Sequence, residues 1–250
     1  MTTIAWIAPH EPLPDSSNAT PEGLVAASWD LSATRLAEAY RKGMFPWFNE
    51  GDPVLWWSPD PRMVLHCDDF KVSHSLAKKI RQLERAEMLP GATLTIRVDT
   101  AFSAVMDACS APRRGQPGTW ISPQIKHAYG EWHHLGAAHS VETWQNGRLV
   151  GGLYGVSLGG MFFGESMFAR VPDASKLALA WLVQFLKRHG VNNIDCQQET
   201  PHLATLGARP VPRAEFIQRV ERAQRLPEPP WNKGQLLYNG TFAPGIRVQP

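Results

Sequence analysis

The sequence contains no long apolar segment and few cysteines. None of its apolar runs approaches the roughly 20 residues that a membrane-spanning helix requires. The first residues lack the basic start and the sustained apolar stretch of a secretory signal. Cys67, Cys109 and Cys196 are an odd number of cysteines at scattered positions, which is typical of a reducing compartment and not of a disulfide framework. We therefore expect a cytoplasmic protein without a membrane partner.

Metal-binding and phosphate-binding motifs are missing as well. The histidines His133, His134 and His139 do not have a zinc-ligand spacing. The glycine-rich stretch at 151–160 lacks the Lys and the Ser or Thr of a phosphate-binding loop, so hairpin turns explain its glycines better. We expect neither a metal nor a cofactor.

The net charge of +2 is too small to predict nucleic-acid binding by itself. Local clusters are the alternative. The basic residues between Lys78 and Arg85, together with Arg113 and Arg114, could contact phosphates. A solvated helix face is the default explanation of the same residues.

The residues that are present predict an α+β fold. Hydrophobic residues make up 43% of the chain, which is enough for a packed core. Asn146-Gly147 is the strongest short hairpin signal and predicts an antiparallel meander over 139–168. We expect a largely antiparallel mixed sheet flanked by helices, with a small N-terminal domain at 1–64 and a larger domain at 65–250. Apolar periodicity predicts helices over 32–43, 74–87, 99–110, 122–136 and 171–190, and strands over 93–99 and 191–197.

The segment IDCQ places an acid, a thiol and an amide side by side on the last of these strands. Side chains alternate faces along a strand, so Asp195 and Gln197 are expected on one face, roughly 6.5–7 Å apart. Cys196 then points to the other face together with Ile194, where a thiol is usually a small buried hydrophobe and not a nucleophile. The sequence therefore assigns any chemistry here to the Asp195 and Gln197 pair.

The segment FFGESMF places one carboxylate among apolar side chains. Alternation puts Glu165 on the same face as Phe163 and Met167, and a buried carboxylate needs a partner. Two interpretations remain open. Glu165 forms a structural ion pair, for example with Arg170, or it is an anionic site for a cationic group of a substrate.

Two of the ten tryptophans lie in predicted loops. Trp47 lies in FPWF and Trp120 in GTWIS. Loop tryptophans often join domains, but they also stack on bases or form the wall of an apolar pocket.

Eight segments, taken in order, closely resemble the leucyl/phenylalanyl-tRNA–protein transferases, the bacterial aminoacyltransferases of the N-end rule. They are AYRKGMFPWF, GDPVLWWSPDPR, GTWIS, LGAAHSVETW, LVGGLYGV, GESMFAR, ASK and IDCQ. The resemblance extends from Pro21 to about residue 220. One departure is AASWDLS, where the family usually has a Gly-Gly-Asp turn.

This resemblance implies a fold and an activity. It implies that the domain at 65–250 is catalytic and has the acetyltransferase (GNAT) superfamily fold. It also implies transfer of Leu or Phe, and less readily Met, from aminoacyl-tRNA to the α-amine of proteins that begin with Arg or Lys, which creates an N-degron for proteolysis. The turn FARVPDASKLA has no Gly for gripping a coenzyme A pyrophosphate, so a CoA-dependent N-acyltransferase is the less favoured alternative. A non-catalytic tRNA-binding module is the other alternative.

Side-chain chemistry suggests roles for the pair on the last strand. The side-chain carbonyl of Gln197 can accept a hydrogen bond from the attacking amine, and Asp195, expected on the same face, can orient the Gln197 amide and favour the positive charge that develops on nitrogen. The resemblance suggests the other roles. Glu165 corresponds to a carboxylate near the basic first residue of the acceptor. The remaining residues bind the donor: Leu153, Phe162 and Leu182 around its side chain, Trp47, Trp120 and Tyr129 around its terminal adenosine, and Tyr40 as a further substrate-binding residue.

Overall fold

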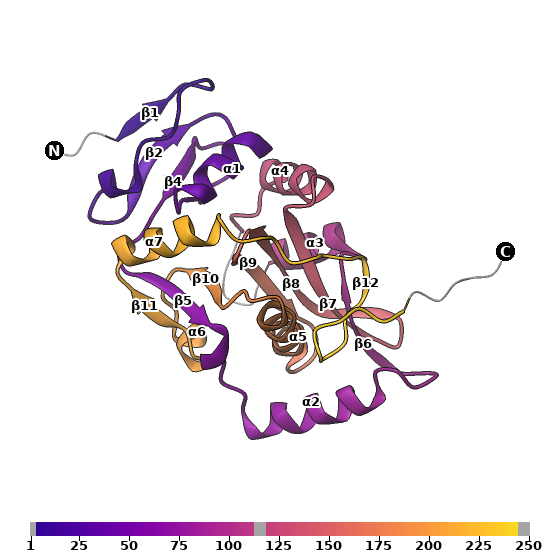
Figure 1. Cartoon of the computed structure of the whole chain (residues 1–250). Coiled ribbons are helices and arrows are strands. Elements are labelled where there is room, and N and C mark those ends of the chain that lie inside the picture. The colour runs from indigo at the N-terminus through magenta and orange to yellow at the C-terminus, as the bar shows by residue number, and fades with distance from the viewer. Residues whose placement is uncertain (1–3, 113–118, 245–250) are drawn as a thin grey trace.

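The computed structural model describes residues 4–112 and 119–244. Its main feature is an eight-stranded sheet with the order β11-β5-β10-β9-β8-β7-β6-β12 (Figure 1). Neighbouring strands of this sheet are antiparallel except β9 and β10, which are parallel. This mixed, largely antiparallel sheet confirms the predicted α+β fold class. Its strands are β5 (Arg62–His66), β6 (Leu94–Val98), β7 (Ala138–Gln145), β8 (Arg148–Leu158), β9 (Met161–Ala169), β10 (Asn193–Gln197), β11 (Arg209–Val211) and β12 (Gly234–Gln235).

The meander β7-β8-β9 lies at the centre of the sheet. Asn146 and Gly147 turn the chain between β7 and β8 with φ of 50° and 71°, as the hairpin signal predicted. Both residues tolerate this left-handed backbone, which most side chains avoid. The tight turn sets the register that brings the functional residues of β8 and β9 together.

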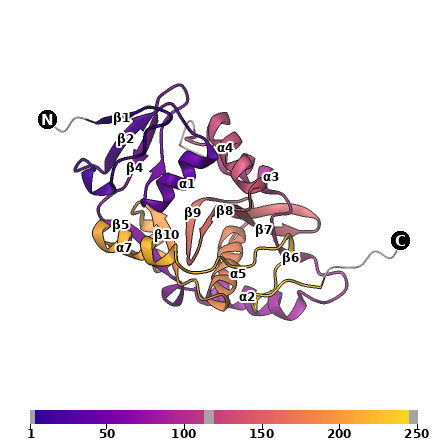
Figure 2. The ribbon, with the colours of Figure 1, turned by 45° about the horizontal axis from the view of Figure 1, so that its top comes forward.

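Helices cover both faces of the sheet (Figures 1 and 2). The long, almost wholly buried helix α5 packs on one face together with α2, while α3 and α4 pack on the other. All five predicted helices are present. The helices are α1 (Ala33–Arg41), α2 (His74–Ala86), α3 (Phe102–Ser110), α4 (Pro123–His134), α5 (Ala174–Arg188), α6 (Pro201–Thr205) and α7 (Arg213–Ala223).

The N-terminal part forms a second, four-stranded sheet with the order β1-β2-β4-β3. Its buried residues belong to the same apolar cluster as those of α3, α4 and one face of the large sheet. The small sheet therefore has no separate core, and the division into domains at 1–64 and 65–250 stays a prediction. The chain passes from one sheet to the other between Trp57 and Arg62, shortly before the predicted limit at residue 64. The strands are β1 (Ala5–Ile7), β2 (Leu24–Ser28), β3 (Phe45–Pro46) and β4 (Val54–Trp57).

Candidate active site

A pocket of about 720 Å³ opens where β9 and β10 separate. The parallel pairing of the two strands ends at Phe163 and Asp195. The next residues of both strands line the pocket, namely 164–167 of β9, Cys196 and Gln197 of β10, and Gln198 directly after β10. Because the strands part here, side chains from both faces of the sheet reach one cavity. A gap between two strands of the central sheet thus forms the candidate site.

One part of the pocket is apolar. Leu153, Phe162 and Leu182 line it together, and their contact with the side chain of a donor stays a prediction. All three side chains are buried. Further apolar side chains complete this wall, namely Leu65, Met167, Leu179 and Ile194.

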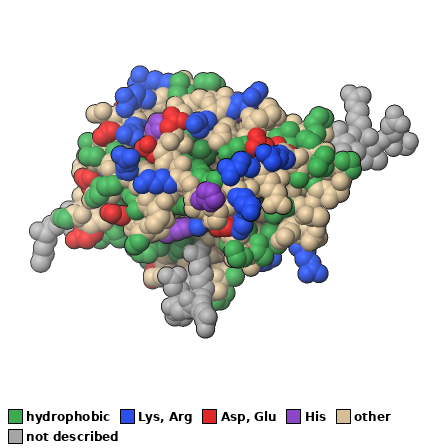
Figure 3. Space-filling model, turned by 90° about the horizontal axis from the view of Figure 1, so that it is seen from below, with side chains coloured by type: hydrophobic (Ala, Val, Ile, Leu, Met, Phe, Trp, Pro, Cys, Tyr) green, Lys and Arg blue, Asp and Glu red, His purple; other side chains and the backbone are tan. Residues whose placement is uncertain are grey.

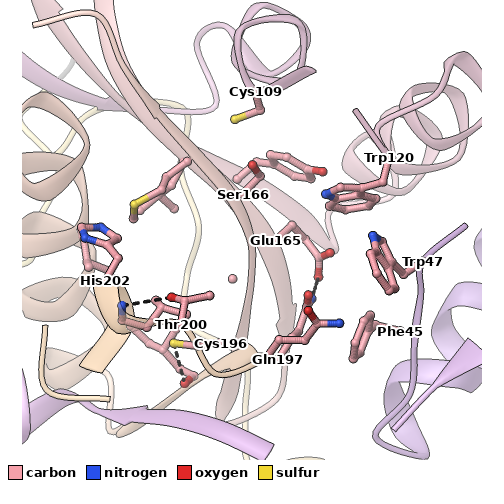
Figure 4. A pocket seen from close by; sticks show the side chains of 18 of the residues that line it. Phe45, Trp47, Cys109, Trp120, Glu165, Ser166, Cys196, Gln197, Thr200 and His202 are labelled. Atoms are coloured by element: carbon pink, nitrogen blue, oxygen red, sulfur yellow. Dashed lines mark hydrogen bonds between the residues drawn. The ribbon is translucent and has the colours of Figure 1, made fainter. Parts of the chain in front are cut away.

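The opposite part of the pocket carries aromatic rings. Trp47 and Trp120 both line it, and Trp47 is 43% exposed, which is high for so large an apolar side chain. Trp47 packs edge-on against Trp57, with ring centroids 5.8 Å apart. Figure 4 shows Trp47 and Trp120 on the same side of the pocket, next to Glu165 and Gln197. The two loop tryptophans therefore present their rings to the cavity.

Glu165 lies at an irregular point of β9, between the two parts of the pocket. β8 pairs Tyr154 with Ser166 and Gly155 with Gly164, so Glu165 is the extra residue of a β-bulge. The bulge interrupts the alternation of side chains. As a result four consecutive residues, 164–167, line the pocket.

The Glu165 carboxylate is held by three donors from three different elements. Tyr40 of α1 donates to Oε1 (2.5 Å), Gln197 of β10 donates through Nε2 to the same oxygen (3.0 Å), and Tyr129 of α4 donates to Oε2 (3.3 Å). The tyrosine hydroxyls also contact each other at 2.5 Å. Arg170 instead donates to the carbonyl of Leu149, so the predicted ion pair with Glu165 is wrong.

The environment of Glu165 changes its acidity. Although the residue as a whole is half-buried, its carboxylate end lies among these three donors, two of which are fully buried tyrosines. Burial raises the pKa of Glu165 to about 7. Hydrogen bonds from Tyr40, Gln197 and Tyr129 oppose the rise, and the charge of Asp195 adds to it. A carboxyl group that titrates near neutral pH can exchange a proton with an amine.

Gln197 ends β10 with a left-handed backbone, at φ 63°. The register of β10 against β5 shifts between Asp195 and Gln197, which is a second β-bulge next to that of Glu165. The Nε2 donation to Glu165 fixes the orientation of the Gln197 amide, so its carbonyl oxygen is available to accept a hydrogen bond.

The predicted faces of IDCQ are wrong because of this bulge. Cys196 and Gln197 both line the pocket, whereas Asp195 is fully buried behind it and does not line it. Asp195 does not hold the Gln197 side-chain amide either, but accepts from the Gln197 backbone N–H at 2.9 Å. Burial raises the pKa of the Cys196 thiol to about 12, so the prediction that sulfur is not the nucleophile needs no change.

Tyr40 and Tyr129 are also placed differently from the prediction. Both are fully buried, and neither lines the pocket. Their rings pack in the cluster beneath the small sheet, and only their hydroxyls reach Glu165. In this structure the two residues therefore reach the pocket through Glu165, and their contact with a substrate stays a prediction.

Arg62 and Tyr154 are polar residues at the site that the sequence did not predict. Arg62 forms a salt bridge with Asp195 (Nη2 to Oδ2, 2.7 Å), and both side chains are fully buried. Tyr154 lines the pocket, and its buried hydroxyl has no hydrogen-bond partner among the described residues. The need of a buried Asp for a partner is a signal that could have pointed to Arg62.

The other predicted features lie outside the pocket. Lys78, Lys79 and Arg81 are exposed on α2, where Lys79 also pairs with Asp173 at 2.5 Å. Figure 3 views the molecule from below, the side of α2 in Figure 1, and this face is rich in Lys and Arg. Arg113 and Arg114 lie outside the described residues.

The histidines singled out in the sequence contact other protein groups. His139 contacts Asp99 at 2.7 Å, and His133 contacts the carbonyl of Ala138 at 2.7 Å. Within residues 4–112 and 119–244, no group of three or more His, Cys, Asp or Glu could hold a metal ion. No helix in the same ranges is both long and apolar enough to cross a bilayer.

Known proteins match most of the chain. The family model for the leucyl/phenylalanyl-tRNA protein transferase matches residues 64–221, and the model for the N-terminal domain of that family matches residues 30–60. Among solved structures, the chain is similar to the structure of L-PGS from Bacillus licheniformis, with 14% identity and a TM-score of 0.36 over 68% of this chain and 51% of that one.

Curated relatives match over nearly their whole length. The chain is 59% identical to the leucyl/phenylalanyl-tRNA–protein transferase of Bordetella bronchiseptica over 96% of both chains. It is 58% identical to the one of Bordetella avium over 95% of this chain and 96% of that one. The chain therefore belongs to the leucyl/phenylalanyl-tRNA–protein transferase family and is an aminoacyltransferase.

Proposed function

We propose that the protein transfers Leu or Phe, and less readily Met, from aminoacyl-tRNA to the N-terminal α-amine of proteins that begin with Arg or Lys. The product is an N-degron, a new N-terminus that marks the protein for proteolysis. The observation that carries the proposal is the arrangement of the pocket. Glu165 and Gln197 lie between an apolar wall and two tryptophans. An aminoacyl-adenosine has the same order of parts, because its reactive ester lies between an apolar side chain and an aromatic base.

The donor fits this arrangement in one orientation. Its Leu or Phe side chain lies against Leu153, Phe162 and Leu182, and the terminal adenine stacks on Trp47 or Trp120. The ester carbonyl then lies near Glu165 and Gln197. Exposed basic residues of α2 are suited to contact phosphates of the tRNA body.

Glu165 and Gln197 act on the acceptor amine. Glu165 is the one carboxylate among the described residues of the pocket wall, so it attracts the positively charged first residue of the acceptor. With a pKa of about 7 it is close to an α-amino group, whose pKa is about 7.7–8.0, so a proton passes between them at little cost. The free carbonyl of Gln197 accepts a hydrogen bond from the same nitrogen and aligns it.

The chemical step is the aminolysis of an ester. The α-ammonium gives one proton to Glu165, and the nitrogen lone pair forms a bond with the ester carbonyl carbon. The bond between this carbon and the ribose oxygen of the terminal adenosine then breaks. The leaving oxygen takes up a proton that the nitrogen loses, which leaves a peptide bond and a deacylated tRNA.

A single assay tests the proposal. The protein is mixed with Leu-tRNA and a peptide that begins with Arg, and the products are identified by mass spectrometry. The expected product is the peptide extended by Leu, with little product from a matched peptide that begins with Glu. Acetyl-CoA replaces the charged tRNA in a second reaction. An acetylated peptide there, or bound Leu-tRNA that stays charged in the first reaction, would contradict the proposal.

A further inference from the structure

Arg62, at the start of β5, joins three separate parts of the protein. Its Nε and Nη2 donate to the two carboxylate oxygens of Asp195 at 2.8 and 2.7 Å, and its Nη1 donates to the carbonyl of Gly43 at 3.0 Å. The guanidinium lies between the rings of Phe45 and Phe216, 4.8 and 4.4 Å from their centroids. Arg62 is fully buried, so these contacts fix it in one geometry.

Asp195 connects Arg62 to the pocket residue Gln197. Its Oδ1, which accepts from Arg62, also accepts the backbone N–H of Gln197 at 2.9 Å. Gln197 has a left-handed backbone at φ 63°, which a residue with a side chain adopts only where its surroundings hold it. The hydrogen bond to the Asp195 carboxylate holds the Gln197 backbone in this conformation, and the Gln197 side chain in turn donates to Glu165.

Arg62 also contacts Gly43 and Phe45, which belong to the segment that carries Trp47. Gly43 and Phe45 precede Trp47 in the chain, and both Phe45 and Trp47 line the pocket. The same guanidinium therefore sets the Trp47 wall and the Gln197 wall relative to each other. Neither Arg62 nor Asp195 lines the pocket itself.

We propose that Arg62 is a positioning residue of the transfer reaction, which acts through Asp195 to hold Gln197 and through Gly43 to hold the Trp47 wall. This inference rests on the proposed function. Under this inference, Asp195 positions the Gln197 backbone through its hydrogen bonds. Its negative charge does not act on the substrate directly.

The test changes geometry while it keeps charge. Arg62→Lys keeps the positive charge, but an ammonium cannot make the two parallel bonds to Asp195 and the bond to Gly43 at once. Asp195→Glu keeps the negative charge and moves the carboxylate away from the Gln197 N–H. If the charge of Asp195 acted on the substrate, both variants would stay active. We expect each to lower kcat about 100-fold, the size typical of a misplacement near 1 Å.

A matched control is Arg35→Lys. Arg35 is likewise buried and held by carboxylates and carbonyls, those of Asp30, Glu38, Ala8, Pro9 and Glu11, but it lies in the N-terminal part and does not line the pocket. We expect Arg35→Lys to lower the melting temperature and to leave kcat unchanged. The double variant Arg62→Lys/Asp195→Glu should be little worse than the poorer single variant, because the two residues act as a unit.

Two readouts decide the matter. Steady-state kinetics with saturating Leu-tRNA and a titrated Arg-peptide should show a loss in kcat, with KM for the peptide within about threefold of the wild type. Hydrogen exchange at the Gln197 amide, measured without substrate, should become about tenfold faster or more in both Arg62→Lys and Asp195→Glu but not in Arg35→Lys. Asp195→Glu keeps the test decisive if Arg62→Lys does not fold.

The outcomes separate the two proposals. A wild-type protein that makes no Leu-peptide contradicts the proposed function, and hydrogen exchange alone then decides whether Arg62 holds Gln197. If the wild type is active and both charge-conserving variants keep its kcat, with melting temperatures lowered as in Arg35→Lys, Arg62 is only structural and the inference is wrong. Faster exchange at Gln197 with unchanged kcat overturns it as well.

Discussion

Two carboxylates lie on neighbouring strands of the central sheet and face very different partners. Asp195 meets the Arg62 guanidinium, a permanent positive charge, and is fully buried. Glu165 meets two tyrosine hydroxyls and an amide, which are neutral, and it lines the pocket. The charge of the first is compensated in place, whereas burial raises the pKa of the second to about 7. The comparison shows that the partner of a buried carboxylate, a cation or a set of neutral donors, decides whether its pKa is raised toward neutral pH.

The largest effect is expected from breaking the ion pair at Asp195. Asp195→Ala leaves the Arg62 guanidinium buried without its counter-ion, so the free energy of unfolding should fall by about 3–5 kcal/mol. Urea denaturation measures it. A loss below about 1 kcal/mol is the size expected for an exposed ion pair. It would contradict the claim that a buried cation compensates the charge of Asp195, in contrast to Glu165.

A large effect on the rate is expected from Glu165→Gln, which keeps the shape but cannot accept a proton. The value of kcat should fall by about 10²–10⁴, the usual contribution of a general base. The exposed Glu221 of α7 gives the control Glu221→Gln, which should keep the wild-type rate. Equal rates for both variants would remove Glu165 from the chemical step.

The same variant should also separate the two carboxylates by their effect on stability. The pKa of Glu165 in the folded protein, about 7, lies above its ordinary value of 4.5, so ionisation disfavours the folded state. The wild type should therefore lose stability relative to Glu165→Gln as the pH rises from about 4.5 to 7, and the difference should stay constant above that range. Melting temperatures from pH 4 to pH 9 measure it. A difference that stays constant between pH 4.5 and 7, or that shifts in favour of the wild type, would contradict the expected sign.

A smaller effect is expected from Tyr40→Phe. Its hydroxyl donates to Glu165 and lowers the pKa of that carboxyl, so the variant should titrate at a pH above 7. A rise of about one unit would reduce the ionised fraction at pH 7 about fivefold, and the rate with it. In the substrate-free protein, Tyr154→Phe is the control, because its hydroxyl has no partner among the described residues. An equal shift in both variants would show that Tyr40 has no special part.

The smallest effect is expected from Cys196→Ala. The thiol lines the pocket, but its pKa of about 12 leaves almost no thiolate at neutral pH. The variant should lose about 1 kcal/mol of stability at most and keep most of its activity. A loss of about a thousandfold in a folded variant would revive nucleophilic catalysis by Cys196.

Much of the fold could be predicted from the sequence, because its signals are local. Asn146-Gly147 predicted the first hairpin of the meander, and apolar periodicity predicted α1, whose first turn Ser32 caps. Leu153, Phe162 and Leu182, which the sequence grouped together, line one pocket in the structure. Such features depend on the periodicity of one element or on motifs that a family shares.

The error in the predicted faces of IDCQ has one physical cause, the β-bulge in β10. Strict alternation placed Gln197 with Asp195 and Cys196 opposite them, but one extra residue in β10 turns both Cys196 and Gln197 toward the pocket. A bulge is set by packing between strands and has no clear sequence signal. The partners of Glu165 could not be found for a similar reason. Tyr40 and Tyr129 are 125 and 36 residues away in the chain, and only the tertiary fold brings them close.

The most direct test of the contrast between Glu165 and Asp195 is a titration of the Glu165 side chain in the substrate-free protein. The carboxyl carbons of glutamate are labelled with ¹³C, and the Glu165 signal is assigned by its loss in Glu165→Gln. Its chemical shift is then followed by NMR from pH 3 to pH 9. The account predicts a midpoint at about pH 7. A midpoint near the ordinary value of 4.5 would contradict it, because Glu165 would then be no better suited than any exposed carboxylate to take a proton from the acceptor amine.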